Sequence, residues 1–239
     1  MTIVVDLDSG EGLYTAEGNG LACLEPFFQR LKRSGARLQA IAVDMGGAYP
    51  KAIDLWGPPG VAIVHDRYHL VAEMNDAIDR VRREEQNRLV GEGKKSIKGS
   101  RYLLLYDQEK LADLPEKKRR LDVLLAENDL LHKAWLLKED LRLFWAQGSK
   151  MDAEKFILGW CSDARSTGNH HLSRIASTIK FHIQAIIAWH DHPISSGPLE
   201  GLNNKIKVLK RTAYGYRDAA FFGLRLLFIH ETEFNLARS

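Results

Sequence analysis

Two short apolar runs near the N-terminus constrain the fold more than any other feature of the chain. Residues 38–43 and 61–65 are nearly continuous apolar segments, and each is followed directly by an aspartate, Asp44 or Asp66. Runs of this length are typical of strands that are buried on both faces. Residues 48–55, between them, have helical spacing and lead into a Gly-Pro-Pro-Gly turn. Strand, helix and strand with such short loops predict a parallel βαβ unit.

The segment before this unit also has strand character. Residues 3–7 and 13–15 are rich in β-branched and apolar residues, and they flank a turn containing Gly, Asp and Ser. This pattern predicts a β-hairpin. Apolar residues at helical spacing follow over residues 21–33, and a Ser-Gly pair ends that helix.

After Asp66 the strand pattern disappears. Apolar residues recur at helical spacing up to about His190, and a loop over residues 190–198 then breaks the pattern. Two more helices are predicted, over about 199–211 and 218–231. We therefore expect a helix-rich α/β chain with a small α/β layer at its front.

Composition excludes several classes of protein. With 45% hydrophobic and 27% charged residues, the chain is neither disordered nor a disulfide scaffold. The two cysteines, Cys23 and Cys161, lack the spacing of a zinc site, so we expect a reducing, cytoplasmic location. No run reaches the roughly 18 apolar residues that a membrane span needs, and we predict no membrane partner.

The net charge of +3 does not identify a partner, but the charge is unevenly distributed. Residues 80–120 carry 13 Lys and Arg against 7 Asp and Glu. Residues 205–217 contain five cations and no acid, with two tyrosines among them. Both stretches predict basic surfaces that contact a nucleic-acid backbone.

The aspartates that end the two predicted strands are the first candidates for chemistry. The carboxyl ends of parallel strands meet at one edge of a sheet, where cations and phosphates are commonly bound. Aspartate also forms turns at strand ends, so either Asp44 or Asp66 alone could be structural. His69 lies three residues after Asp66, where it could orient a metal-bound carboxylate or contact a phosphate.

The helix predicted over residues 199–211 is the second candidate. Glu200 lies in its first turn, and Asn203 or Asn204, Lys207, and Lys210 or Arg211 share its face at helical spacing. An ordinary amphipathic helix with an acid in its first turn would explain much of this pattern. It would not explain the aromatic and basic residues that follow.

The histidines of the predicted helical region are assigned to structure. His170, His171 and His182 have no acid at ligand spacing in the sequence, so we predict packing or surface roles for them. His190 and His192 flank Asp191, and a solvated loop is favoured there over a metal or phosphate contact.

Four sequence strings, DMGGAY, VHDRYHL, EGLNNKIKVLKRTAYGYRD and FFGLRLLF, resemble the DDE transposase domain of bacterial insertion sequences of the ISL-three family. The resemblance extends over essentially the whole chain. It implies a ribonuclease H-like mixed sheet interrupted by a large all-helical insertion. Residues 1–67 would then be the first part of the catalytic core, residues 68–192 the insertion, and residues 193–239 the C-terminal helices that carry the glutamate.

The resemblance also implies the chemistry. In that family three acids hold divalent metal, Mg²⁺ or Mn²⁺ with two ions expected, for cleaving and joining DNA strands. By motif position Asp44 is similar to the second acid and Glu200 to the third, while Asp66 and His69 match an Asp-x-x-His signature and Asp66 is a further metal ligand. The implied partners are the DNA of the element ends and the target, and a second copy of the full-length enzyme, with no small-molecule cofactor. The predicted DNA contacts are Asn203, Lys205, Lys207, Lys210, Arg211 and Arg217.

No residue matches the first acid of the family, which lies on a strand before residues 3–7. We therefore predict a truncated transposase fragment that lacks this central strand and the upstream DNA-recognition segments. Such a chain should fold poorly unless the hairpin pairs with residues 38–43. Two alternatives remain open: a non-catalytic DNA-binding remnant that inhibits the full-length transposase, and a ribonuclease H-like nuclease.

Overall fold

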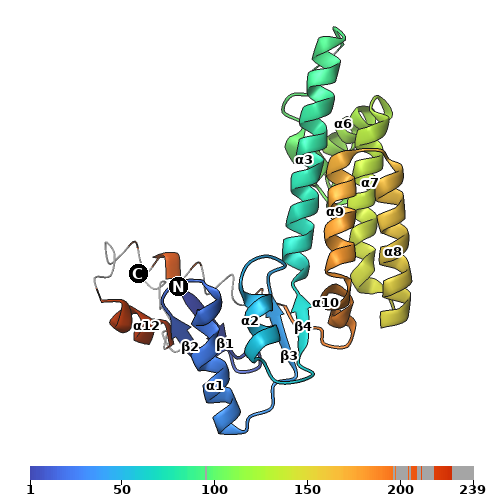
Figure 1. Cartoon of the computed structure of the whole chain (residues 1–239). Coiled ribbons are helices and arrows are strands. Elements are labelled where there is room, and N and C mark those ends of the chain that lie inside the picture. The colour runs from blue at the N-terminus through green and yellow to red at the C-terminus, as the bar shows by residue number, and fades with distance from the viewer. Residues whose placement is uncertain are drawn as a thin grey trace. The chain divides into compact units, whose positions relative to one another are not determined.

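The computed structural model describes residues 1–94, 96–195, 197, 204, 206–208, 211 and 218–227. It divides into two compact units (Figure 1). An α/β unit combines Met1–Asp66 with His192–Ser239, and a helical unit consists of Arg67–Asp191. The α/β unit is thus built from both ends of the chain, whereas the helical unit is continuous in sequence.

The α/β unit contains two small sheets. Strand β1 (Thr2–Val5) pairs antiparallel with β2 (Gly12–Ala16), with an irregularity between Val4 and Val5. Strand β3 (Ala40–Val43) pairs parallel with β4 (Ala62–His65). The predicted hairpin and βαβ unit are confirmed. Among the described residues, however, the hairpin is not paired with the segment 38–43, and the strands do not form one mixed sheet.

One hydrophobic core explains how the two sheets are held in the same unit. A 3-10 turn, η1 (Leu21–Leu24), leads into α1 (Glu25–Ser34), and α2 (Tyr49–Trp56) connects β3 to β4. These helices bury Phe27, Phe28 and Ile53 against side chains from both sheets. The sheets therefore share a core without sharing a hydrogen-bonded ladder. The apolar side chains from the strands are Val4, Tyr14, Ile41, Val43 and Ile63.

Helix α12 (Ala219–Leu227) packs on the hairpin from the other end of the chain. Its buried Phe222 and Leu226 contact Ile3 of β1. The approach to β2 is close: a Cβ on Gly223 would lie 2.9 Å from Thr15 Oγ1. Glycine at this position permits the contact between helix and strand.

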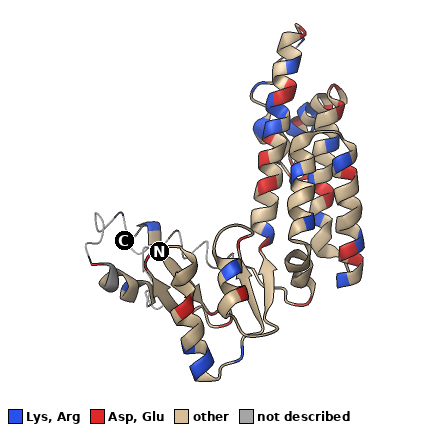
Figure 2. Cartoon of the chain, in the orientation of Figure 1, with Lys and Arg blue, Asp and Glu red and all other residues tan. Residues whose placement is uncertain are grey.

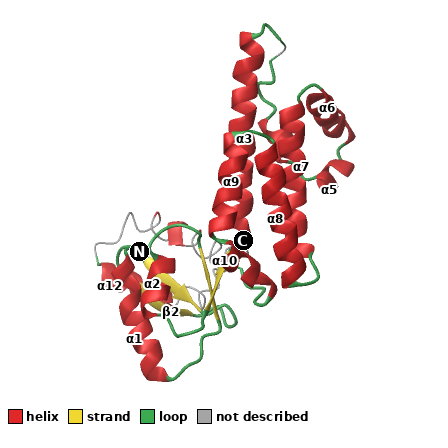
Figure 3. Cartoon of the chain, turned by 45° about the vertical axis from the view of Figure 1, so that its right-hand side comes forward, coloured by secondary structure: helices red, strands yellow, loops and turns green. Residues whose placement is uncertain are grey.

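The helical unit accounts for most of the secondary structure (Figure 3). Helices α3 (Arg67–Gly91), α7 (Asp129–Leu143), α8 (Lys150–Ser166) and α9 (His170–Phe181) pack side by side. No helix in the described part of the chain is long and apolar enough to cross a bilayer. The remaining elements are α4 (Arg101–Leu105), α5 (Gln108–Ala112), α6 (Pro115–Ala126), η2 (Phe144–Ala146), α10 (Ile183–Ile187) and η3 (Ala188–His190).

Side-chain caps define where α8 and α9 begin. The Ser149 hydroxyl accepts a hydrogen bond from the backbone N–H of Asp152 at 3.1 Å. The Asn169 side chain accepts hydrogen bonds from the N–H groups of His171 and Leu172, at 2.9 and 3.3 Å. These bonds satisfy donors that have no partner inside the helix. As a result, the residues after Asn169 have a fixed position on the surface of the helical unit.

A lysine lies inside the helical unit. Lys138 of α7 is only 3% exposed, and burial lowers the pKa of its amine. Its Nζ donates to the carbonyl oxygens of Leu104 and Tyr106, at 3.2 and 2.6 Å, and lies 2.8 Å from Glu139 Oε1. Lys138 therefore ties the end of α4 to α7.

The two cysteines have different surroundings, which predicts different reactivity. Cys161 of α8 is fully buried, and burial raises the pKa of its thiol to about 11. The thiolate is the reactive form of cysteine. In the folded chain near about pH 8 we therefore expect a disulfide reagent to label Cys23, which is partly exposed, and not Cys161. In urea we expect both thiols to react. A Cys23→Ser variant is the control. Rapid labelling of folded Cys23→Ser would contradict the burial of Cys161.

Candidate strand-end carboxylate site

Asp44 and Asp66 follow neighbouring strands at the same edge of a sheet. The parallel register pairs Val43 with His65, so each aspartate is the next residue after a paired position. Neighbouring strands are about 4.8 Å apart, and in-register residues point to the same side of the sheet. The fold thereby brings together two acids that are 22 positions apart in the sequence.

The two carboxylates have different environments. Asp44 is exposed, at the start of the loop that leads to α2. Asp66 is only 1% exposed, and its Oδ2 accepts a hydrogen bond from Ser195 Oγ at 3.0 Å. A buried carboxylate needs polar partners to offset its loss of hydration. Asp66 is thus buried and hydrogen-bonded to Ser195, and Asp44 is exposed.

Ser195 also organises the C-terminal segment. Its Oγ accepts a hydrogen bond from the backbone N–H of Gly197 at 3.0 Å. The hydroxyl therefore connects Asp66 to a segment 129 positions further along the chain. Ser195 is not among the candidates predicted from the sequence, because a serine in a Ser-Ser-Gly loop has no local signal of such a partner.

The last paired residues of the two strands, Val43 and His65, are also joined by a side-chain contact. His65 is 5% exposed, and its Nδ1 lies 3.2 Å from the carbonyl oxygen of Val43. This contact crosses from β4 to β3 directly beside the two aspartates. It links the ends of the two strands from which Asp44 and Asp66 project.

The donor set at this edge fits a hard divalent cation. Carboxylate oxygens are the ligands that Mg²⁺ and Mn²⁺ prefer in proteins. Asp44 offers an exposed carboxylate, and Asp66 a buried one with a fixed orientation. The chemistry of these two side chains is therefore compatible with metal binding.

The other predicted site residues are placed as follows. His69 lies in the first turn of α3, in the helical unit, where its ring contacts Tyr68 edge-on at 5.9 Å between centroids. Lys207 and Arg211 belong to the α/β unit, and both are exposed. The remaining candidates lie outside the described residues: Glu200, Asn203, Lys205, Lys210 and Arg217.

The basic stretch over residues 80–120 is largely paired within the chain. Figure 2 shows acidic and basic residues interleaved along α3. Asp79, one residue before the stretch, forms ion pairs with Arg82 at 2.7 Å and with Arg83 at 2.8 Å. Burial alone would raise the pKa of Asp79, but hydrogen bonds from Arg82 and the charges of Arg82, Arg83 and Arg101 lower it. Many cations counted in the sequence are therefore engaged in intramolecular contacts.

Some cations of this stretch have no ion pair within the part of the chain that the structure describes. They are Arg80, Lys98 and Arg120, which are exposed, and Lys117, which is half-buried and donates a hydrogen bond to the Tyr106 hydroxyl. Fewer cations of residues 80–120 are therefore available to contact DNA than the 13 Lys and Arg in the sequence indicate.

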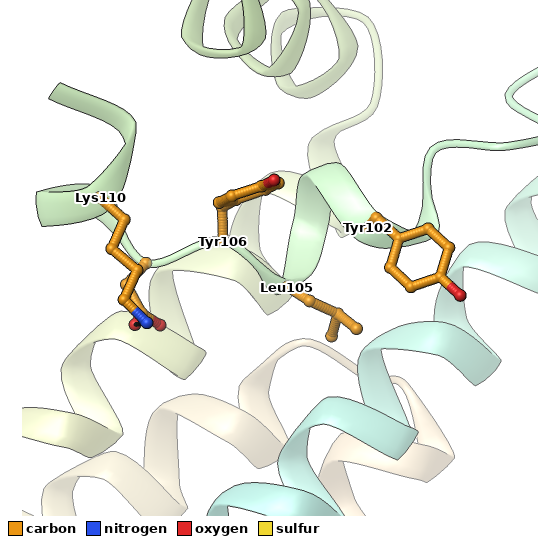
Figure 4. A pocket seen from close by; sticks show the side chains of 5 residues that line it. Tyr102, Leu105, Tyr106 and Lys110 are labelled. Atoms are coloured by element: carbon orange, nitrogen blue, oxygen red, sulfur yellow. Dashed lines mark ion pairs between the residues drawn. The ribbon is translucent and has the colours of Figure 1, made fainter. Parts of the chain in front are cut away.

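A pocket in the helical unit lies beside α4 and α5 (Figure 4). It is lined by Tyr102, Leu105, Tyr106, Asp107 and Lys110. Lys110 Nζ lies 3.6 Å from Asp107 Oδ2, and Asp107 also pairs with Arg142 of α7. None of the predicted site residues lines this pocket, and it offers a single carboxylate. It does not have the paired acids of the strand-end site.

Comparison with known proteins identifies similar sequences over most of the chain. A family model of the ISL3 type of DDE transposases, described as "Transposase", matches residues 1–226. The transposase for insertion sequence element IS1001 of Bordetella parapertussis is 34% identical over 229 residues, which cover 94% of this chain and 56% of that protein. The transposase for insertion sequence element IS1557 of Mycobacterium tuberculosis is 30% identical over 244 residues, covering 91% of this chain and 54% of that protein. The chain therefore spans about half the length of these curated relatives. No solved structure matches it.

Proposed function

This chain belongs to the ISL3 family of DDE transposases, and on that basis we propose that it carries the metal-binding part of a catalytic domain that cleaves and joins DNA strands in insertion-sequence transposition. The βαβ unit would belong to a ribonuclease H-like core formed by residues 1–67 and 193–239. Residues 68–192 would be the helical insertion of that core.

The observation that carries the proposal is the arrangement at the strand ends. Asp44 and Asp66 follow in-register residues of β3 and β4, and Ser195 hydrogen-bonds to Asp66. Ser195 precedes Glu200 by five positions in the sequence. The contact thus supports bringing the segment that contains Glu200 to the edge where the two aspartates lie.

In this proposal Asp44, Asp66 and Glu200 are the protein ligands of Mg²⁺ or Mn²⁺. When bound, two such ions supply activation of water or a 3′-hydroxyl and stabilisation of the leaving oxygen. Ser195 fixes the carboxylate of Asp66, and the exposed Asp44 faces solvent from which DNA can approach. His69, in the Asp-x-x-His motif, would contact a phosphate or orient a ligand.

A strand-transfer assay tests this function. The purified chain, DNA carrying the ends of its own element, a target plasmid and Mg²⁺ are combined, and cleaved and joined products are separated on a gel. Cleavage with joining supports the proposal. Cleavage without joining would assign a nuclease instead, and DNA binding without either reaction would assign the non-catalytic remnant.

The DNA contacts proposed near the site give a prediction of their own. We expect the Lys207→Ala, Arg211→Ala double variant to bind DNA more weakly, because both cations are exposed and available to phosphates. The slope of log affinity against log salt should fall by about 1.8, which is about 0.9 for each phosphate that is no longer neutralised. Fluorescence anisotropy with a labelled duplex at several salt concentrations measures both effects.

The matched control is the Lys32→Ala, Arg33→Ala double variant. These cations are also exposed and lie at the end of α1 in the same unit, so the same charge is removed elsewhere. An equal reduction of the salt slope in both double variants would mean that overall charge, and not the proposed surface, determines binding. The other proposed contacts are Asn203, Lys205, Lys210 and Arg217.

A further inference from the structure

Three metal-ligating side chains converge on the surface of the helical unit. Glu84 projects from α3, and His170 and His171 occupy the first turn of α9. Glu84 Oε1 lies 3.0 Å from His171 Nε2 and 3.7 Å from His170 Nδ1. One ligand atom from each residue lies within 4.8 Å of the other two. The acid comes from a different helix, more than 80 positions away, which is why the sequence showed no acid partner for these histidines.

The carboxylate of this cluster is oriented by a fourth residue. Asn169 Nδ2 donates to Glu84 Oε2 at 3.0 Å, which leaves Oε1 directed at the two histidines. The Asn169 oxygen simultaneously caps α9 and fixes the backbone of His171. Asn169 is itself 9% exposed. Hydrogen bonds of this kind to a ligating group, from residues that do not touch the metal, are typical of protein metal sites.

The distances are close to those of a coordinated ion. Four-coordinate zinc with bonds of about 2.0–2.1 Å places its ligand atoms roughly 3.4 Å apart. The separations of 3.0 and 3.7 Å lie on either side of this value. Small side-chain rotations would equalise them, and the 72% exposure of the His170 side chain leaves that ring room to move.

We propose that Glu84, His170 and His171 bind a divalent transition metal of the zinc class, which fastens α3 to α9. Two imidazole nitrogens and one carboxylate oxygen favour Zn²⁺, Co²⁺ or Ni²⁺ over Mg²⁺, which prefers oxygen ligands. The site is open to solvent, so water can complete the coordination. It shares no residue with the strand-end carboxylates and does not depend on the proposed function.

Zinc binding to the intact chain tests the proposal. After chelator treatment, the chain is titrated with ZnCl₂ by calorimetry in a large excess of Mg²⁺, which occupies oxygen-only sites. We expect one Zn²⁺ per chain, and binding at least about tenfold weaker in His170→Ala and in Glu84→Gln. Co²⁺ should give visible absorption bands in the parent chain that these variants lose. At about 100-fold excess over its Kd, Zn²⁺ should raise the melting temperature of the parent chain by roughly 5–10 °C.

His132→Ala is the matched control, since His132 is exposed on α7 and lies outside the cluster. This variant should bind Zn²⁺ like the parent chain. If the cluster were only a hydrogen-bonded link between helices, His170→Ala would leave Zn²⁺ affinity and the Zn²⁺-dependent melting shift unchanged. That result, or the absence of stoichiometric binding by the parent chain, would overturn the proposal. Circular dichroism of the metal-free variants confirms that they are folded.

Discussion

Replacing Asp44 by Asn is expected to reduce Mg²⁺-dependent strand cleavage about a thousandfold, which corresponds to about 4 kcal/mol of lost transition-state stabilisation. The amide removes a negative charge from the edge where Asp44 and Asp66 follow paired strand residues. Because Asp44 is exposed, the change should leave the fold intact. The measurement is the initial rate of cleavage of labelled element ends, together with the circular dichroism of the variant.

Asp54→Asn is the control for this prediction. Asp54 is also an exposed acid of the α/β unit, but it lies on α2 and not at a strand end. Its rate should remain within about twofold of the parent, as expected for a surface change away from the reacting groups. Equal rates for Asp44→Asn and Asp54→Asn would show that Asp44 is not part of the catalytic site. This holds if both variants keep the parent rate, and also if both are slower through a general effect of charge.

Replacing Lys138 by Met is expected to lower the free energy of unfolding by roughly 2–4 kcal/mol. Met nearly preserves the volume of the buried stem but removes every donor. The carbonyl oxygens of Leu104 and Tyr106 are then left without their bonds to Nζ, and Glu139 loses the nearer of its two ion-pair partners, keeping only Arg142 at 4.0 Å. Urea unfolding followed by circular dichroism measures the change, since the helical unit supplies most of the signal.

Lys133→Met, on the same helix, is the control for this prediction. It shows how much stability is lost when an exposed lysine is removed. Lys133 pairs with Asp129 at 2.7 Å, but both side chains are more than half exposed. An exposed pair contributes at most about 1 kcal/mol. A Lys138→Met variant that is no less stable than Lys133→Met would show that the buried amine does not hold α4 to α7.

The parts of the fold that could be predicted from the sequence are those with a local signal. An apolar run that ends in Asp44 or Asp66 marks a strand, and the short helical segment between the two requires a parallel pair. How the two sheets are arranged within the unit has no such local signal in the sequence. The hairpin is held to the βαβ unit by core contacts and not by hydrogen bonds to 38–43, and this depends on how Phe28 and Ile53 pack.

The candidate site divides in the same way. The two strand-end aspartates follow from the local pattern, whereas the hydrogen bond from Ser195 to Asp66 joins positions 129 apart. Counting charges over 80–120 also missed Asp79, one residue before the stretch, whose carboxylate engages Arg82 and Arg83. Their spacing of three and four residues is visible in the sequence, but a net charge does not reveal it.

The docking of α12 on the hairpin has a consequence for how the chain is made. The segment that covers Ile3, around Phe222, is synthesised about 150 residues after Asp66, where the first part of the α/β unit ends. At about 5–20 residues per second this delay is roughly 8–30 s, during which the continuous helical unit is completed first. Each nascent chain thus presents an uncovered apolar hairpin face for many seconds. Correct maturation of the α/β unit should therefore be more sensitive to temperature and chaperone supply than that of the helical unit.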